Sequence, residues 1–120
     1  MKRLCLRMKE VGVDTDSVVT RLGGNVKLYL SICLKFLTDP TFYFITKAVS
    51  QNNFTEALVH IHTLKGVAAN LGFVRLQLLC KNLIEELNNR EYSDFYKDYS
   101  VLEKEYRTLI SILTVVKKET

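Results

Sequence analysis

The chain has 120 residues, the length of one domain. Its 17 lysines and arginines against 13 aspartates and glutamates give a net charge of +4. Because 48% of the residues are hydrophobic and 25% are charged, the chain has enough apolar side chains for a buried core, which disfavours intrinsic disorder. Five glycines and one proline are too few for an all-β domain, which needs many turns.

The sequence favours a cytoplasmic protein. No stretch of about 18 uncharged apolar residues occurs, so we expect no membrane span. The segment Met1–Lys9 is basic but lacks the apolar run of a signal peptide, which disfavours secretion. The chain has three cysteines, an odd number, and no C-x-x-C pair: Cys5, Cys33 and Cys80. We therefore expect reduced cysteines and neither a disulfide framework nor a metal site.

The first predicted helices are short. Asp14–Asp16 offers N-cap residues for a helix that runs to Leu22, and Gly23–Gly24 ends it. We expect residues 1–22 to form one or two such helices, which cover one end of the remaining structure.

The next helix begins after Asn25, a good N-cap residue. Apolar residues recur at helical spacing along it: Val26, Tyr29, Leu30, Cys33, Phe36 and Leu37. Asp39-Pro40 interrupts the pattern, because a proline inside a helix costs about 3 kcal/mol but is tolerated in a first turn. The chain therefore either kinks there or ends one helix and begins another, which continues to Val49.

A turn at Gln51–Asn53 precedes the helix of greatest interest. Asn53 followed by Glu56 resembles a capping box, with asparagine in place of serine or threonine. The helix is predicted to reach Leu71, because Gly72 suits a helix exit.

Two further long helices follow, separated by Asn88–Asn89. The first carries Leu76, Leu79, Cys80, Leu83 and Leu87. The second carries a stripe with alternating steps of four and three residues: Phe95, Tyr99, Leu102, Tyr106, Leu109, Leu113 and Val116. Four long helices with short connections predict an all-α fold, an antiparallel up-and-down four-helix bundle over about residues 25–118. We expect residues 1–120 to form a single domain.

One helix carries residues with chemical potential. On a helical wheel its apolar residues fall within an arc of about 100°, which must face the core. These are Phe54, Ala57, Ile61, Leu64, Ala68 and Leu71. His62 lies to one side of this arc, and Lys65, Gly66 and Ala69 share its stripe because residues three and four apart are neighbours on a helix.

This arrangement suits phosphoryl transfer. A neutral imidazole is a competent nucleophile near pH 7 and forms covalent intermediates. Lys65 is placed to stabilise negative charge on a group arriving at His62. Gly66 costs about 1 kcal/mol relative to alanine inside a helix, and it leaves room for a partner protein to bring a bulky phosphoryl donor to the ring.

These residues resemble the signature of histidine-containing phosphotransfer (HPt) domains of bacterial two-component phosphorelays. The resemblance rests on His62-x-Leu64-Lys65-Gly66 followed by Asn70-Leu71-Gly72. The segments Val13-Asp14, Arg21–Asn25 and Leu28–Leu30 are similar to the opening of such domains, so the resemblance covers about residues 8–115.

The resemblance implies a phosphorelay intermediate without ATP-dependent kinase activity. Such a domain accepts a phosphoryl group on histidine from an aspartyl phosphate of a receiver domain and passes it to another receiver. The resemblance implies that His62 is the phosphoacceptor, that Lys65 stabilises the charge of the phosphate and that Gly66 gives steric access. The partners are receiver domains of response regulators or hybrid histidine kinases, and the receiver brings Mg²⁺, so the chain needs no cofactor and no metal of its own. We expect a monomer.

Other residues near the signature have open roles. His60 projects about 200° round the helix from His62 and is expected to be a packed or half-exposed structural residue. In HPt domains a polar residue on the neighbouring helix commonly orients the acceptor ring, a role that Asn82 or Glu85 is available to fill here. Phe73 and Val74 either add apolar area to receiver docking or plug the end of the bundle.

The alternative function is a helical adaptor that binds a signalling partner while His62 is never phosphorylated. Nucleic-acid binding is disfavoured, because lysines and arginines are spread along the chain among acidic residues and no recognition motif occurs.

Overall fold

The structure is a computed structural model that describes residues 2–119, so Met1 and Thr120 lie outside the described residues. Every regular element in this range is helical: seven α-helices and one short 3-10 helix. The predicted all-α class is therefore confirmed. Within residues 2–119 no helix is both long and apolar enough to cross a membrane.

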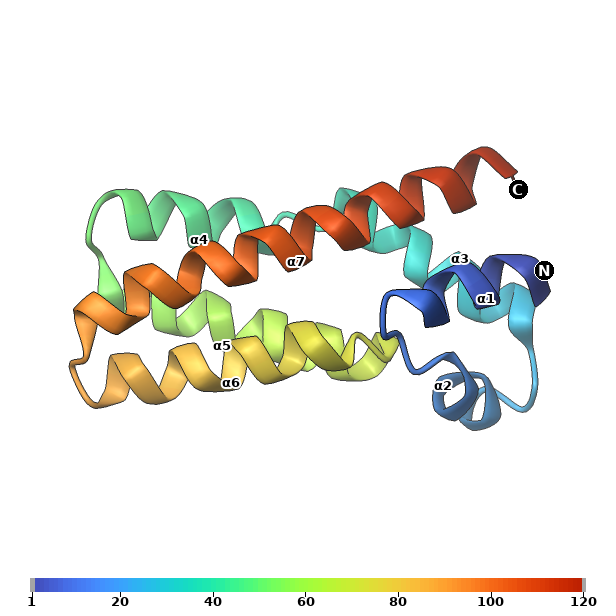
Figure 1. Cartoon of the computed structure of the whole chain (residues 1–120), viewed down its shortest axis with the longest axis horizontal. Helices are drawn as coiled ribbons and strands as arrows, with labels where there is room; N and C mark the ends of the chain where they lie inside the picture. The colour runs from blue at the N-terminus through green and yellow to red at the C-terminus, as the bar shows by residue number, and fades with distance from the viewer. Residues whose placement is uncertain (1, 120) are drawn as a thin grey trace.

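The N-terminal helices form a layer at one end of the molecule (Figure 1). Helix α1 spans Lys2–Glu10 and α2 spans Thr15–Arg21. The Asp14 carboxylate accepts a hydrogen bond from the Ser17 backbone N–H at 3.3 Å, so it caps α2 as predicted. Helix α1 contacts α7, and α2 contacts α5, so the two helices cover one end of the longer helices.

The chain changes direction at Pro40 by ending one helix and beginning another. Helix α3 covers Val26–Lys35, a 3-10 turn follows at Phe36–Thr38, and α4 covers Thr41–Ser50. The Asp39 carboxylate accepts the Thr41 backbone N–H at 2.8 Å, which satisfies a donor at the start of α4. Of the two alternatives at this proline, the break is therefore the correct one.

Three long helices complete the chain: α5 at Phe54–Leu71, α6 at Val74–Asn88 and α7 at Tyr92–Glu119. Helix α5 packs against α4 on one flank and α6 on the other, and α6 packs against α7. Figure 1 shows α4, α5, α6 and α7 side by side in the part of the molecule away from the N-terminus.

The core contains the predicted apolar stripe of α5. Ala57, Ile61, Leu64 and Ala68 are fully buried, and Leu71 is 5% exposed. Full burial of an Ile or Leu side chain contributes about 1.5–3 kcal/mol, so this stripe strongly fixes the rotation of α5 about its axis. The residues on the opposite side of α5 must then face solvent.

Residues of α2, of α3 and of the segment before α2 hold the C-terminal end of α5. The Tyr29 hydroxyl donates to the Leu71 carbonyl at 2.8 Å, and an Arg21 guanidinium nitrogen donates to the Asn70 carbonyl at 3.3 Å. The Asp14 backbone N–H donates to the Gly72 carbonyl at 2.8 Å. Carbonyls at a helix C-terminus lack partners within the helix, so these bonds fix where α5 ends.

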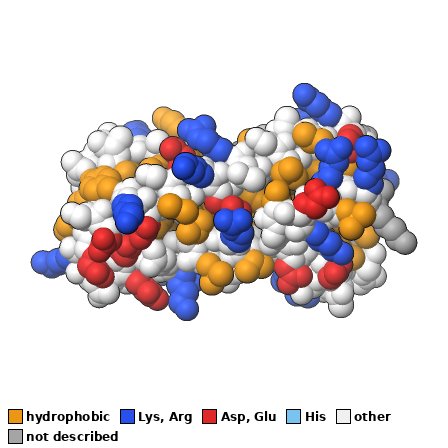
Figure 2. All heavy atoms as spheres, viewed as in Figure 1, with side chains coloured by type: hydrophobic (Ala, Val, Ile, Leu, Met, Phe, Trp, Pro, Cys, Tyr) orange, Lys and Arg blue, Asp and Glu red, His pale blue; other side chains and the backbone are white. Residues whose placement is uncertain are grey.

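A buried carboxyl group lies between α6 and α7. Glu86 is only 8% exposed. The Asn82 amide donates to Glu86 Oε1 at 3.4 Å and to Asp98 Oδ2 at 3.1 Å. Burial, a hydrogen bond with Asp98 and the charges of Asp98, Asp94 and Glu91 raise the pKa of Glu86 to about 7. Acidic side chains gather over this end, where α6 meets α7 (Figure 2).

Glu86 predicts a pH-dependent stability near neutrality. Its pKa is higher in the folded chain than its ordinary value of 4.5, so folding favours the protonated form. Its contribution to stability is complete below about pH 4.5 and is lost as the pH rises through about 7. We expect Glu86→Gln to be more stable than the parent protein at pH 8 by about 1–2 kcal/mol, measured by urea denaturation.

Glu85→Gln, at an exposed neighbouring position, is the matched control and should follow the parent protein across the same pH range. If the parent protein and Glu86→Gln lose stability equally between pH 5 and 8, the raised pKa of Glu86 is wrong.

Candidate functional site

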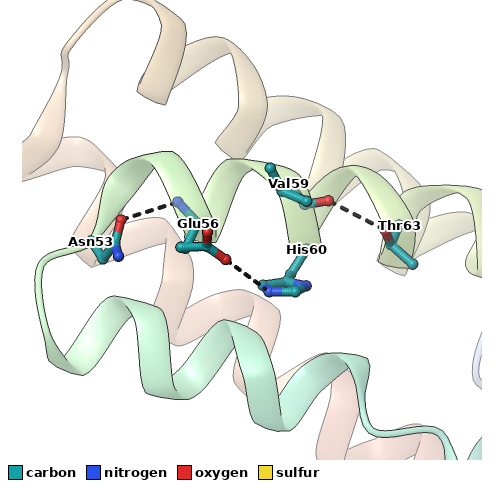
Figure 3. Close-up of polar contacts among 5 residues, drawn as sticks. All are labelled: Asn53, Glu56, Val59, His60 and Thr63. Carbon is teal, nitrogen blue, oxygen red and sulfur yellow. Dashed lines mark hydrogen bonds and ion pairs between the residues drawn. The ribbon is translucent and has the colours of Figure 1, made fainter.

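The start of α5 is fixed by polar contacts on its α4 side (Figure 3). The Asn53 side chain accepts the Glu56 backbone N–H at 3.2 Å, which is one half of the predicted capping box. The other half does not form, because the Asn53 backbone N–H donates to the Ala48 carbonyl at 2.9 Å. The Glu56 carboxylate instead lies 3.4 Å from His60 Nε2.

His60 is a packed residue, as predicted. Its side chain is 27% exposed, and its ring lies against Phe44 of α4 with the two ring centroids 5.3 Å apart. Together with the Glu56 contact, this packing holds His60 on the flank that faces α4 (Figure 3). His60 and His62 therefore lie on different sides of α5.

His62 lies on the solvent side of α5. Its side chain is exposed, while its neighbour Ile61 is fully buried. Among the described residues the imidazole has no hydrogen-bond or ion-pair partner, so neither ring nitrogen is engaged within the chain. An exposed imidazole on a helix anchored by its buried face is accessible to another protein and changes orientation only by its own side-chain rotation.

Lys65 lies between His62 and α6. It is half-buried, and it is close enough to Cys80 of α6 to act on the thiol. Burial raises the pKa of Cys80 to about 12, and the positive charge of Lys65 opposes that rise. The stem of Lys65 therefore lies along the seam between α5 and α6, one helical turn from His62.

Gly66 leaves the surface beside His62 open. A Cβ atom built on Gly66 would meet no atom within 4 Å. Close helix–helix packing does not explain this glycine, because no neighbouring helix approaches it. Gly66 and His62 are four residues apart and share one face of α5, so the ring is bordered there by bare backbone.

Two further expectations are resolved by the packing around α6. Asn82 faces α7, and its amide donates to Asp98 of α7 and to Glu86 of α6. In residues 2–119 no hydrogen bond or ion pair joins Glu85 to His62. Neither residue orients the ring within this chain. Phe73 is 1% exposed and packs edge-on against Phe36, so it plugs the end of the helices, whereas Val74 is 38% exposed.

Comparison with known families identifies the chain. The model of the Hpt domain matches residues 43–111, which is more than half of the chain and includes α5 and α6 entirely. The chain therefore belongs to the Hpt domain family, whose members carry out histidine phosphotransfer in phosphorelays and generally lack kinase activity. No curated protein and no solved structure matches the chain significantly.

Gly66 inside α5 and Gly72 at its C-terminal end predict opposite effects on stability. Gly66→Ala adds a methyl group in open space and improves helix propensity, so we expect the free energy of unfolding to rise by about 1 kcal/mol. At Gly72 the backbone φ is +80°, and a Cβ would lie 2.6 Å from the Asp14 carbonyl oxygen. Gly72→Ala should therefore destabilise by about 1–3 kcal/mol. Chemical denaturation measures both; a loss of stability in Gly66→Ala would contradict the open surface.

Proposed function

We propose that this protein is a phosphorelay intermediate in which His62 accepts a phosphoryl group from the aspartyl phosphate of one receiver domain and passes it to another. The observation that supports this most strongly is the position of His62: exposed, beside the open surface of Gly66, on a helix whose opposite face is fully buried. Membership of the Hpt family supports the same chemistry.

The proposed step is a displacement at phosphorus. A ring nitrogen of neutral His62 forms a bond to phosphorus while the bond between phosphorus and the aspartyl oxygen breaks. The electron pair of the broken bond stays on the receiver's carboxylate, and the ring keeps the proton on its other nitrogen. The same displacement in reverse passes the phosphoryl group from His62 to the aspartate of a second receiver.

The neighbours of His62 have separate tasks in this proposal. Lys65 supplies positive charge next to the phosphoryl oxygens, and phosphoryl transfer depends mainly on such charge stabilisation and on positioning. Gly66 leaves the receiver's loops room to approach the ring. The receiver brings Mg²⁺ and the acidic residues that hold it, so the chain itself supplies no metal ligand and no nucleotide site.

We interpret helices α4–α7 as the antiparallel bundle that carries this site, with the chain acting as a monomer. The seam between α5 and α6 is the face presented to a receiver of a response regulator or hybrid kinase. The N-terminal layer packs at the C-terminal end of α5, the end opposite its cap at Asn53. It therefore supports the site without covering it.

The function predicts that phosphorylation depends on His62 and not on His60. The protein is incubated with Mg²⁺ and a panel of receiver domains charged with labelled acetyl phosphate. We expect the label to move to the parent protein and to His60→Gln, and not to His62→Gln. The transferred label should be lost in acid and survive base, because the phosphorus–nitrogen bond of phosphohistidine is acid-labile.

His60→Gln is the matched control, since it removes the other imidazole of the same helix. If a broad panel of receivers transfers no label to the folded parent protein, phosphotransfer is excluded and the adaptor function takes its place. Receiver binding that is unchanged in His62→Gln would support that adaptor function.

The open surface at Gly66 predicts a separation of folding from transfer. Gly66→Leu places a branched side chain on the face of His62, at a position where a Cβ atom meets no other atom within 4 Å. We expect the variant to fold and to accept phosphate from a receiver at least ten times more slowly, since about 1.4 kcal/mol of steric cost is a tenfold change in rate. Transfer at the parent rate would show that receivers do not approach over Gly66.

A further inference from the structure

Helix α6 presents different residues to its two neighbours. The Asn82 amide donates to Asp98 of α7. Arg75 lies two turns earlier on the same flank, and its Nε is 3.7 Å from Oε1 of Glu105 in α7. This flank of α6 therefore faces α7. Lys81 precedes Asn82 by one residue, which places it about 100° round the helix, on the exposed edge that borders α5.

Lys81 is also level with His62 along the seam. Helices α5 and α6 are joined by the short turn at Gly72–Phe73 and run antiparallel. The charge of Lys65 opposes the rise in the pKa of Cys80, so Lys65 and Cys80 lie opposite each other across the seam. His62 is three residues from Lys65, and Lys81 is one residue from Cys80 in the same direction along the seam. At 1.5 Å per residue the two Cα positions differ in height by only about 3 Å.

A lysine spans the remaining gap. Packed helix axes lie about 8–10 Å apart, a distance that a long side chain on the edge of one helix can cover to reach a group on the edge of the next. Lysine carries its charge at the end of a flexible four-carbon stem, which lets it follow a group attached to the His62 ring. Unlike Lys65, Lys81 is exposed and is free to reorient.

No other basic residue of α6 offers this contact, because Arg75, its other cation, faces α7. Ile84, the next residue on the α5 side, is apolar and 7% exposed. Gln77 lies one turn closer to Gly72 and is therefore level with Ala68, away from the His62 ring. Lys81 is thus the cation of α6 that lies nearest in height to His62 on the α5 side, while Glu85, exposed and equally close in height, carries a negative charge.

We propose that Lys81 is a second cation of the phosphoryl site, which contacts the phosphoryl oxygens from α6 while Lys65 contacts them from α5. This inference rests on the proposed function of His62. The two ammonium groups would flank the phosphoryl group across the seam and stabilise both the transition state and phosphorylated His62, as charge-assisted hydrogen bonds do at phosphate sites.

The test uses potassium phosphoramidate, a small phosphodonor that needs no receiver docking. The His62 ring nitrogen bonds to phosphorus while the phosphorus–nitrogen bond of phosphoramidate breaks, and ammonia leaves with its electron pair. We expect Lys81→Gln to be phosphorylated roughly three to ten times more slowly than the parent protein, as for the loss of one partly exposed charged contact. Lys81→Arg should retain most of the rate.

Lys97→Gln is the matched control, because it removes one exposed positive charge from α7 and should leave the rate unchanged. A second readout is the ³¹P resonance of phosphorylated His62. A nearby cation favours the doubly charged phosphoryl group, so its titration midpoint should move to higher pH in Lys81→Gln and stay in place in Lys97→Gln. A merely structural role for Lys81 would not produce this difference.

The outcomes separate the two proposals. If the parent protein is phosphorylated and Lys81→Gln matches Lys97→Gln in rate and in the ³¹P midpoint, the role of Lys81 is overturned while the function of His62 stands. If folded parent protein is phosphorylated at His62 neither by phosphoramidate nor by the receiver panel, the proposed function fails, and the role of Lys81 fails with it.

Discussion

The fixed rotation of α5 is the constraint on which the rest of the structure depends. Ala57, Ile61, Leu64 and Ala68 are fully buried, and turning the helix by one residue would expose them and bury His62. Such a turn would forfeit several kcal/mol of apolar burial, since each large side chain contributes about 1.5–3 kcal/mol. The core therefore presents the imidazole to solvent without any direct contact to it.

Both ends of α5 are held by the chain around it. Asn53 caps its start. At its other end, Arg21 of α2 and Tyr29 of α3 donate hydrogen bonds to its last carbonyls. Gly72 permits the close approach of the Asp14 segment, which a larger residue would block. An acceptor helix held at both ends suits phosphoryl transfer, because transfer demands accurate positioning of two reacting groups.

Periodicity and caps predicted the helical class, the stripe of α5 and the separate sides of His60 and His62, because these depend on local spacing. Three features depend on how the helices pack and could not be read from spacing alone. Asn82 was a candidate for orienting His62, but the α6–α7 contact turns it toward Asp98. Lys81 was not singled out, because the inference that it borders α5 depends on that same contact. The buried carboxyl of Glu86 was not anticipated, since glutamate in a helix is ordinarily solvated.

The central claim is that one imidazole of the chain, that of His62, becomes phosphorylated. Long-range ¹H–¹⁵N correlation spectra of protein labelled with ¹⁵N-histidine resolve the two rings individually, before and after incubation with a phosphorylated receiver and Mg²⁺. The account predicts that the His62 ring signals move to phosphohistidine positions while those of His60, packed against Phe44 and Glu56, stay in place. Movement of the His60 signals instead, or of neither ring with any receiver, would contradict it.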